Sequence, residues 1–110
     1  MLLIGQPLLV EAAAQDAAAS VDLSRIGVEN STHFIRWNEG VASGIVVIEA
    51  AGNPDETAAW HVLETVVFDN DGPSLVAKVI AGSFRAIRHR VSEVVVDGTV
   101  STRIEASGAW

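Results

Sequence analysis

The chain has 110 residues, enough for one domain with its own core and too few for two. Hydrophobic residues make up 49% and charged residues 19%, which excludes an intrinsically disordered chain. The net charge of −7 argues against nucleic acid as a partner, because phosphate binding needs clustered basic side chains, and the absence of cysteine excludes disulfides and thiolate metal sites.

Residues 1–16 are predicted to form an N-terminal arm, and residues 17–110 a β-sandwich domain. We expect no signal cleavage, because the opening run lacks a positive charge and is interrupted at Gln6-Pro7. We also expect no membrane span, since no run approaches about 20 apolar residues. The alanines that follow favour a helix, yet they lack a wide apolar stripe, so an extended arm or a strand stays open.

Such an arm is too apolar to remain in water without a partner. We therefore expect it to contact another protein and to be dispensable for folding. The arm residues assigned to this contact are Leu2, Leu3, Ile4, Leu8, Leu9 and Val10.

After the arm, short runs rich in Val and Ile alternate with clusters of Gly, Asn, Asp and Pro, which is typical of strands separated by turns. This spacing predicts an all-β fold, an antiparallel two-sheet sandwich or jelly roll of about seven to eight strands. The predicted strands are 18–26, 33–38, 43–50, 60–68, 75–81, 85–96 and 98–106.

The last predicted strand alternates most regularly, with Val100, Thr102, Ile104 and Ala106 on one face and polar residues on the other. A period of two with one polar face indicates an antiparallel sheet that is solvated on one side. Asp97-Gly98 precedes it and suits a type I′ turn, so we predict a tight hairpin with the strand before.

In the strand before that turn, Ile87, His89 and Val91 share one face while Arg88 and Arg90 share the other. A solvated sheet face explains these charges, because arginine stems cover apolar neighbours while their heads reach water. The alternative is a set of arginines (Arg85, Arg88, Arg90) that pairs with acidic residues of a neighbouring subunit.

His33, His61 and His89 are spaced 28 residues apart and could bind zinc if they met in space. No established ligand spacing accompanies them, so we expect no metal site. The stretch DNDG at 69–72 resembles a fragment of a calcium loop but lacks the further oxygen ligands, and a β-turn explains it better.

No motif of an enzyme is present, neither a nucleophile elbow nor a glycine-rich phosphate loop, and we expect no catalytic residues and no cofactor. Trp37 and Trp60 fall in or at the start of predicted strands, so core packing is the default expectation. An exposed pair could instead stack on sugar rings. Trp110 ends the chain and is predicted to fold back on the sandwich or to lie in an interface.

The order of these features resembles the small β-sandwich virion proteins of tailed bacteriophages, from about Ala17 onward. The matching elements are a Val-rich strand, then Trp60 and Leu63, then a strand carrying an aromatic residue, a hydrophobic residue and an arginine, and a closing Gly-Thr-Val strand. The strand with the aromatic residue, the hydrophobic residue and the arginine carries Phe84, Ile87 and Arg88. The closing strand begins with Gly98, Thr99 and Val100.

This resemblance implies a virion protein without enzymatic activity, most simply a capsid decoration or cement protein that acts as a homo-oligomer such as a trimer. Its partners would be other virion proteins, the major capsid protein or tail proteins, and not nucleic acid or membrane. A tail or receptor-binding spike component is one alternative, and a carbohydrate-binding module is another.

Overall fold

The computed structural model describes residues 2–23, 28–51, 60–69 and 72–108, with side chains from Ile4 onward. In these ranges the chain forms eight strands, and no helix there is long and apolar enough to cross a bilayer. The first of these strands lies in the predicted arm and was not predicted as a strand. The boundaries of the other seven lie within three residues of those predicted, except that 24–26 fall outside the described residues. The strands are β1 (Leu2–Pro7), β2 (Ala18–Asp22), β3 (Asn30–Trp37), β4 (Ser43–Ala51), β5 (His61–Phe68), β6 (Leu75–Ala81), β7 (Ala86–Val96) and β8 (Val100–Ser107).

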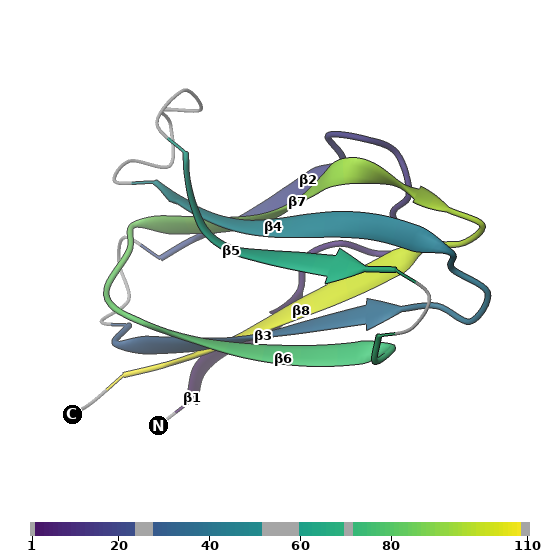
Figure 1. The fold of residues 1–110 in the computed structure, drawn as a ribbon. Helices are drawn as coiled ribbons and strands as arrows, with labels where there is room; N and C mark the ends of the chain where they lie inside the picture. The colour runs from purple at the N-terminus through teal and green to yellow at the C-terminus, as the bar shows by residue number, and fades with distance from the viewer. Residues whose placement is uncertain (1, 24–27, 52–59, 70–71, 109–110) are drawn as a thin grey trace.

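The strands form two four-stranded sheets, ordered β1-β8-β3-β6 and β2-β7-β4-β5, which lie face to face (Figure 1). The first strand pairs with the last, the second with the seventh, the third with the sixth and the fourth with the fifth, and every pair is antiparallel. Successive pairs lie alternately in one sheet and the other. This nesting is the topology of an eight-stranded jelly roll. The prediction of an all-β antiparallel sandwich is confirmed.

The core lies between the sheets and follows the period-two pattern of the strands. In β8, Val100, Thr102, Ile104 and Ala106 are all buried, as the alternation predicted. In β7 the inward face includes Ile87, His89 and Val91, also as predicted. Branched aliphatic side chains therefore fill much of the space between the sheets, while β4 is buried on both faces along most of its length.

The N-terminal segment does not form a free arm. Strand β1 adds to the edge of β8, and Leu8 and Leu9 are buried in the core. Backbone hydrogen bonds fix this arrangement: the Leu8 N–H donates to the Thr102 carbonyl and the Thr102 N–H donates to the Leu9 carbonyl, both at 2.9 Å. Further along, Ala12 exchanges backbone hydrogen bonds with Val100. Burial of their own side chains thus removes Leu8 and Leu9 from any partner contact, which corrects that assignment.

Asp97-Gly98 does not close a hairpin. Strand β7 lies in one sheet and β8 in the other, so the turn carries the chain across the sandwich. Asp97 adopts a left-handed φ of 63°, but Gly98 does not, whereas a type I′ turn needs positive φ at both central residues. Glycine is required at 98 for another reason, because a Cβ there would lie 2.6 Å from Cγ2 of Val41.

Candidate functional site

Two arginines on the outward face of β7 bind one buried carboxylate. Glu49 on β4 is only 4% exposed, although it points away from the core. The Nε atoms of Arg88 and Arg90 both donate to Oε1 of Glu49, at 2.8 and 3.0 Å. Burial alone would raise the pKa of Glu49, but the hydrogen bonds and charges of Arg90 and Arg88 outweigh it and lower that pKa. The carboxylate therefore stays ionised and holds both guanidinium groups.

Two further side chains extend this group, which we call the outer arginine cluster: Asp16, Glu49, Trp60, Arg88 and Arg90. Nη1 of Arg90 donates to Oδ1 of Asp16 at 3.0 Å. The guanidinium carbon of Arg88 lies 4.5 Å from the centre of the Trp60 ring, a cation–π contact. The cluster thus joins the β1–β2 connection, β4, β7 and the start of β5, and it holds its charges in fixed positions.

Replacing Glu49 tests whether the cluster stabilises the fold. We expect Glu49→Gln to lower the free energy of unfolding by about 1.5–3 kcal/mol, because two charged donors lose their anionic acceptor. Asp16→Asn is the matched control, since the Asp16 side chain is 71% exposed and its ion pair contributes at most about 0.5 kcal/mol. Urea titration at neutral pH measures both variants, and equal losses would contradict the special role of Glu49.

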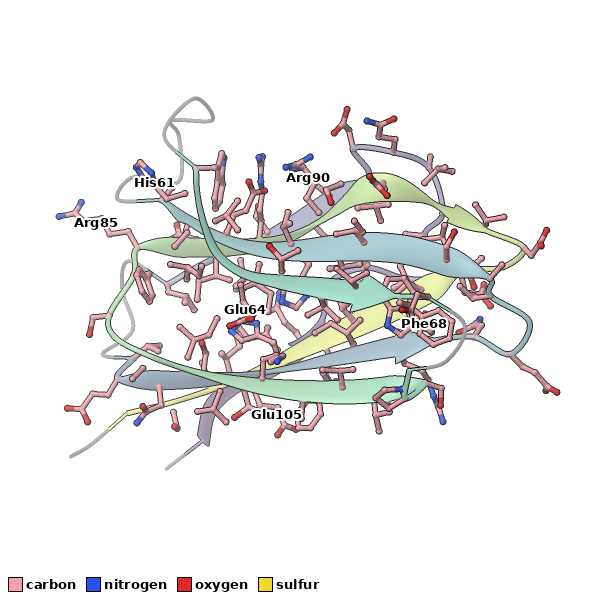
Figure 2. All side chains as sticks on the ribbon, in the orientation of Figure 1. His61, Glu64, Phe68, Arg85, Arg90 and Glu105 are labelled. Atoms are coloured by element: carbon pink, nitrogen blue, oxygen red, sulfur yellow. The ribbon has the colours of Figure 1, made fainter. Side chains whose placement is uncertain are left out.

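The three arginines proposed from the sequence do not form one surface. Arg88 and Arg90 pair with acidic residues of their own chain, whereas Arg85 is exposed just before β7. Figure 2 shows Arg85 at one end of the sandwich, apart from Arg90 over the sheet. Of these three arginines, Arg85 is therefore the one best placed to reach a partner.

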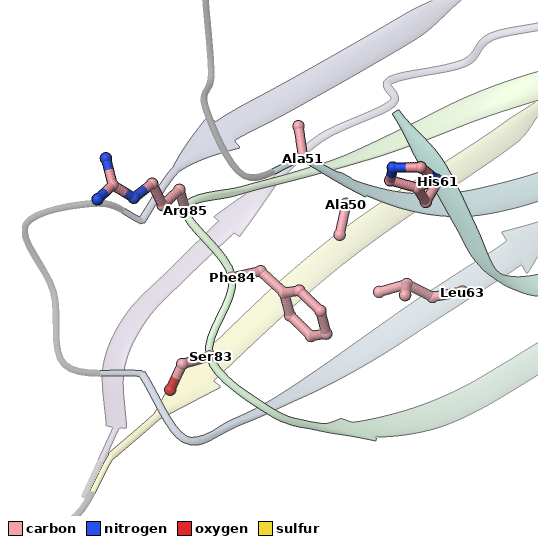
Figure 3. A pocket seen from close by; sticks show the side chains of 7 residues that line it. All are labelled: Ala50, Ala51, His61, Leu63, Ser83, Phe84 and Arg85. Atoms are coloured by element: carbon pink, nitrogen blue, oxygen red, sulfur yellow. The ribbon is translucent and has the colours of Figure 1, made fainter. Parts of the chain in front are cut away.

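A shallow pocket of about 350 Å³ opens beside Arg85, where the end of β4 and the start of β5 meet the β6–β7 connection. The Phe84 ring points toward Leu63 inside it, while Arg85 points away and His61 lies at its rim (Figure 3). Oγ of Ser83, also in its lining, already donates to the Val28 carbonyl at 2.6 Å. The remaining lining residues are Ala50 and Ala51, so the pocket offers mainly hydrophobic contact.

The structure brings together two of the three histidines. His33 and His89 are completely buried, and Nδ1 of His33 lies 2.7 Å from Nε2 of His89, which is a hydrogen bond between the rings. His61 is exposed on β5. Within the described ranges no group of three or more His, Cys, Asp or Glu side chains could hold a metal ion. Asn70 and Asp71 of the calcium-like stretch lie outside the described residues.

The histidine pair belongs to a longer polar chain between the sheets. Oγ of Ser31 lies 2.7 Å from Nε2 of His33, and Nδ1 of His89 lies 2.6 Å from Oγ1 of Thr102. The Leu9 N–H donates to the same Thr102 oxygen at 3.0 Å. We call Ser31, His33, His89 and Thr102 the inter-sheet polar chain. It links β3 and β8 in one sheet to β7 in the other.

Burial sets the ionisation of the two histidines in the inter-sheet polar chain. It lowers the pKa of His33 to about 4 and, together with the nearby charge of His33, lowers that of His89 to about 3. Both rings are therefore neutral at pH 7. Sequence alternation already placed His89 among inward residues, but the pairing across the sheets needed the three-dimensional packing.

The tryptophans do not form an exposed pair. Trp37 is 2% exposed and stacks on Phe68 with ring centres 5.4 Å apart, which confirms its predicted place in the core. Trp60 is half-buried beneath the Arg88 guanidinium. The alternative that these two residues form a sugar-stacking platform is therefore wrong, because Trp37 lies inside the sandwich. Trp110 lies outside the described residues.

No protein-family model and no curated protein sequence matches the chain. Solved structures with a similar fold include the K2 cleaved adhesin domain of Lys-gingipain, with a TM-score of 0.63, 6% identity, and coverage of 82% of this chain and 62% of that one. The K1 cleaved adhesin domain of Lys-gingipain from Porphyromonas gingivalis W83 has a TM-score of 0.58, 10% identity and coverage of 84% and 61%. This chain thus spans about three-fifths of each adhesin domain. The SPBc2 prophage-derived protein YomS has a TM-score of 0.57 and 15% identity, with 97% of this chain and 98% of YomS covered. At these identities the likeness shows the fold alone.

Proposed function

We propose that the chain is a non-enzymatic structural protein of a tailed-phage particle, where it decorates or cements the capsid as a homo-oligomer such as a trimer. The observation that carries the proposal is the match with the prophage-derived YomS, which extends over nearly the full length of both chains. The sequence resemblance to small virion sandwiches supports the same class. Virion proteins would be its partners.

The mechanism is binding linkage. A subunit that binds the assembled shell and not the free capsid protein stabilises the shell by mass action. Of the residues first assigned to the contact, Val10 is 69% exposed and Arg85 is exposed, so these two remain available to a partner. The side chains of Leu2 and Leu3 and the whole of Trp110 lie outside what the structure describes.

The absence of enzymatic activity is part of the proposal. The two imidazoles that lie close together are completely buried, where no substrate reaches them. The charged groups of the outer arginine cluster are occupied by one another. A protein that acts by surface contact needs neither group to be free.

A second candidate is a tail or receptor-binding spike component. The similarity of the fold to two adhesin domains favours it, because a spike acts by adhesion to a surface. Both candidates place the protein on the particle, and they differ in its location. Immunogold labelling of whole particles separates them, since a decoration protein labels the head and a spike labels the tail.

A binding assay tests the proposal. Purified protein is added to particles from a phage whose copy of this gene has been deleted, and occupancy is measured by co-sedimentation. We expect saturable binding, and we expect Val10→Ser/Arg85→Ser to weaken it at least tenfold. Val67→Ser is the matched control, because Val67 is 60% exposed and was not assigned to the contact. Absence of saturable binding by the unaltered protein would overturn the proposal.

A further inference from the structure

The inter-sheet polar chain suggests a property beyond the proposed particle role. We propose that the buried His33–His89 pair is an acid-sensitive lock: uptake of two protons breaks the hydrogen bond that joins the two sheets, and the sandwich loses stability in mildly acidic solution. The bond is 2.7 Å long, and both rings are completely buried. It connects β3 of one sheet directly to β7 of the other.

In the neutral state every ring nitrogen has a partner. Each neutral imidazole has one N–H donor and one acceptor nitrogen. One direction of donation starts at Thr102 and gives every ring nitrogen a partner: Thr102 donates to His89, His89 donates to His33, and His33 donates to Ser31. The Thr102 oxygen then accepts from the Leu9 N–H as well. The opposite order, starting at Ser31, also satisfies all four ring nitrogens.

The first proton can enter without breaking a hydrogen bond. If His33 is ionised, it donates to Ser31 and to Nε2 of His89, and His89 donates to Thr102. A second proton places N–H groups on both sides of the 2.7 Å contact, with no acceptor between them. Two positive charges then face each other in a dry core, which is costly without a compensating anion.

The neighbouring strands supply little compensation. On the inner face, His33 is paired across strands with Lys78 of β6 and Ile104 of β8, and His89 with Ala19 of β2 and Ile48 of β4. Lys78 is itself a cation.

The carboxylate on this inner face is Glu64 of β5, which pairs with Ile48 rather than with either histidine. Figure 2 shows Glu64 at the open side between β5 and β6. Arg88, Arg90 and Glu49 point to the opposite face of their sheet and bind one another. Among the described residues, neither imidazole has a hydrogen bond to a carboxylate.

The lowered pKa values support the lock and give the direction of its pH dependence. An unfolded histidine has a pKa near 6.5, whereas these fold with values of about 4 and about 3. The folded state therefore binds fewer protons than the unfolded state below pH 6.5, and stability falls as the pH falls from there. From pH 7 to pH 5 the unfolding equilibrium constant should rise roughly 500-fold, with a slope approaching two protons per molecule.

Urea unfolding followed by tryptophan fluorescence between pH 7.5 and pH 5 tests this. We expect that 500-fold rise in the unaltered protein and in the control His61→Gln, which removes only the exposed imidazole. The double variant His33→Leu/His89→Leu should have a nearly flat profile over the same range. A flat profile for the unaltered protein, or an equally steep profile for the double variant, would overturn the lock.

A second measurement decides the matter if the double variant does not fold. Nitrogen chemical shifts of the imidazoles in the unaltered protein report their protonation directly. We expect His33 and His89 to stay neutral in the folded protein down to pH 5, because neither can take up a proton without cost while it is buried. Titration of either ring within the folded state near pH 6.5 would contradict the lock. This result is independent of particle binding, so either proposal can fail alone.

Discussion

Removal of residues 1–10 is expected to unfold the domain rather than to yield a folded domain without its partner contact. The deletion takes away β1 and the buried side chains of Leu8 and Leu9. Each buried leucine contributes about 2–5 kcal/mol, and the lost strand leaves one edge of β8 without its hydrogen bonds. The sum is comparable with the whole stability of a small domain, about 5–15 kcal/mol. Circular dichroism and urea titration measure the outcome.

A point substitution shows how much of the lost stability comes from a buried side chain rather than from deletion of the whole segment. Leu9→Ala should lower the free energy of unfolding by about 2–5 kcal/mol, because Leu9 is 4% exposed. Val10→Ala is the matched control and should change it by at most about 0.5 kcal/mol, since Val10 is 69% exposed. A truncated protein with full β content and an unchanged urea midpoint would show that the N-terminal segment is an arm after all.

Trp37→Ala is expected to have the largest effect of any single substitution considered. Trp37 is 2% exposed, stacks on Phe68, and fits so closely above Gly44 that a Cβ there would lie 2.8 Å from its ring. Truncation leaves a cavity that the two sheets cannot fill, and the expected loss is about 3–5 kcal/mol. Thermal and urea unfolding measure it.

Trp60→Ala is the control for Trp37. Trp60 is half-buried and its ring contacts Arg88, so its removal should cost about 1–2 kcal/mol, mainly from lost packing and the cation–π contact. Acrylamide quenching gives an independent check. Quenching should be weaker in Trp60→Phe, which retains Trp37, than in Trp37→Phe, which retains Trp60, because Trp37 is the better shielded of the two. Equal losses in the two alanine variants would contradict the different burial of the two rings.

The strands after residue 17 could be predicted because their signals are local. Alternation in β8 depends on side chains that point to opposite faces of one strand, and the turns are marked by Gly, Asn, Asp and Pro. The two faces of β7 followed from the same rule. These patterns establish strands and their buried faces, which is enough for the sandwich.

What could not be predicted depends on contacts between distant parts of the chain. Asp97-Gly98 has the composition of a hairpin turn, yet β8 already has β1 and β3 on its two sides, so the turn must lead to the other sheet. Leu8 and Leu9 looked like part of an exposed arm, because nothing in the local sequence shows that one edge of β8 needs the N-terminal segment to cover it. A segment is an arm or a strand according to what covers it, which the sequence of the segment alone does not contain.

The candidate site shows the same division. Period-two alternation placed Arg88 and Arg90 outside and His89 inside, and all three positions are confirmed. Their partners come from elsewhere: Glu49 is 39 residues from Arg88, and His33 is 56 residues from His89. Only the packing of β4 beside β7, and of one sheet on the other, brings these groups together.

The most direct test of the proposed particle role is a count of this protein in purified particles of the phage proposed to encode it. Quantitative mass spectrometry, with the major capsid protein as the internal reference, gives the number of copies per particle. We predict a fixed ratio that persists through repeated gradient purification. A protein found only in the fraction free of particles, with none retained on the purified virion, would contradict it.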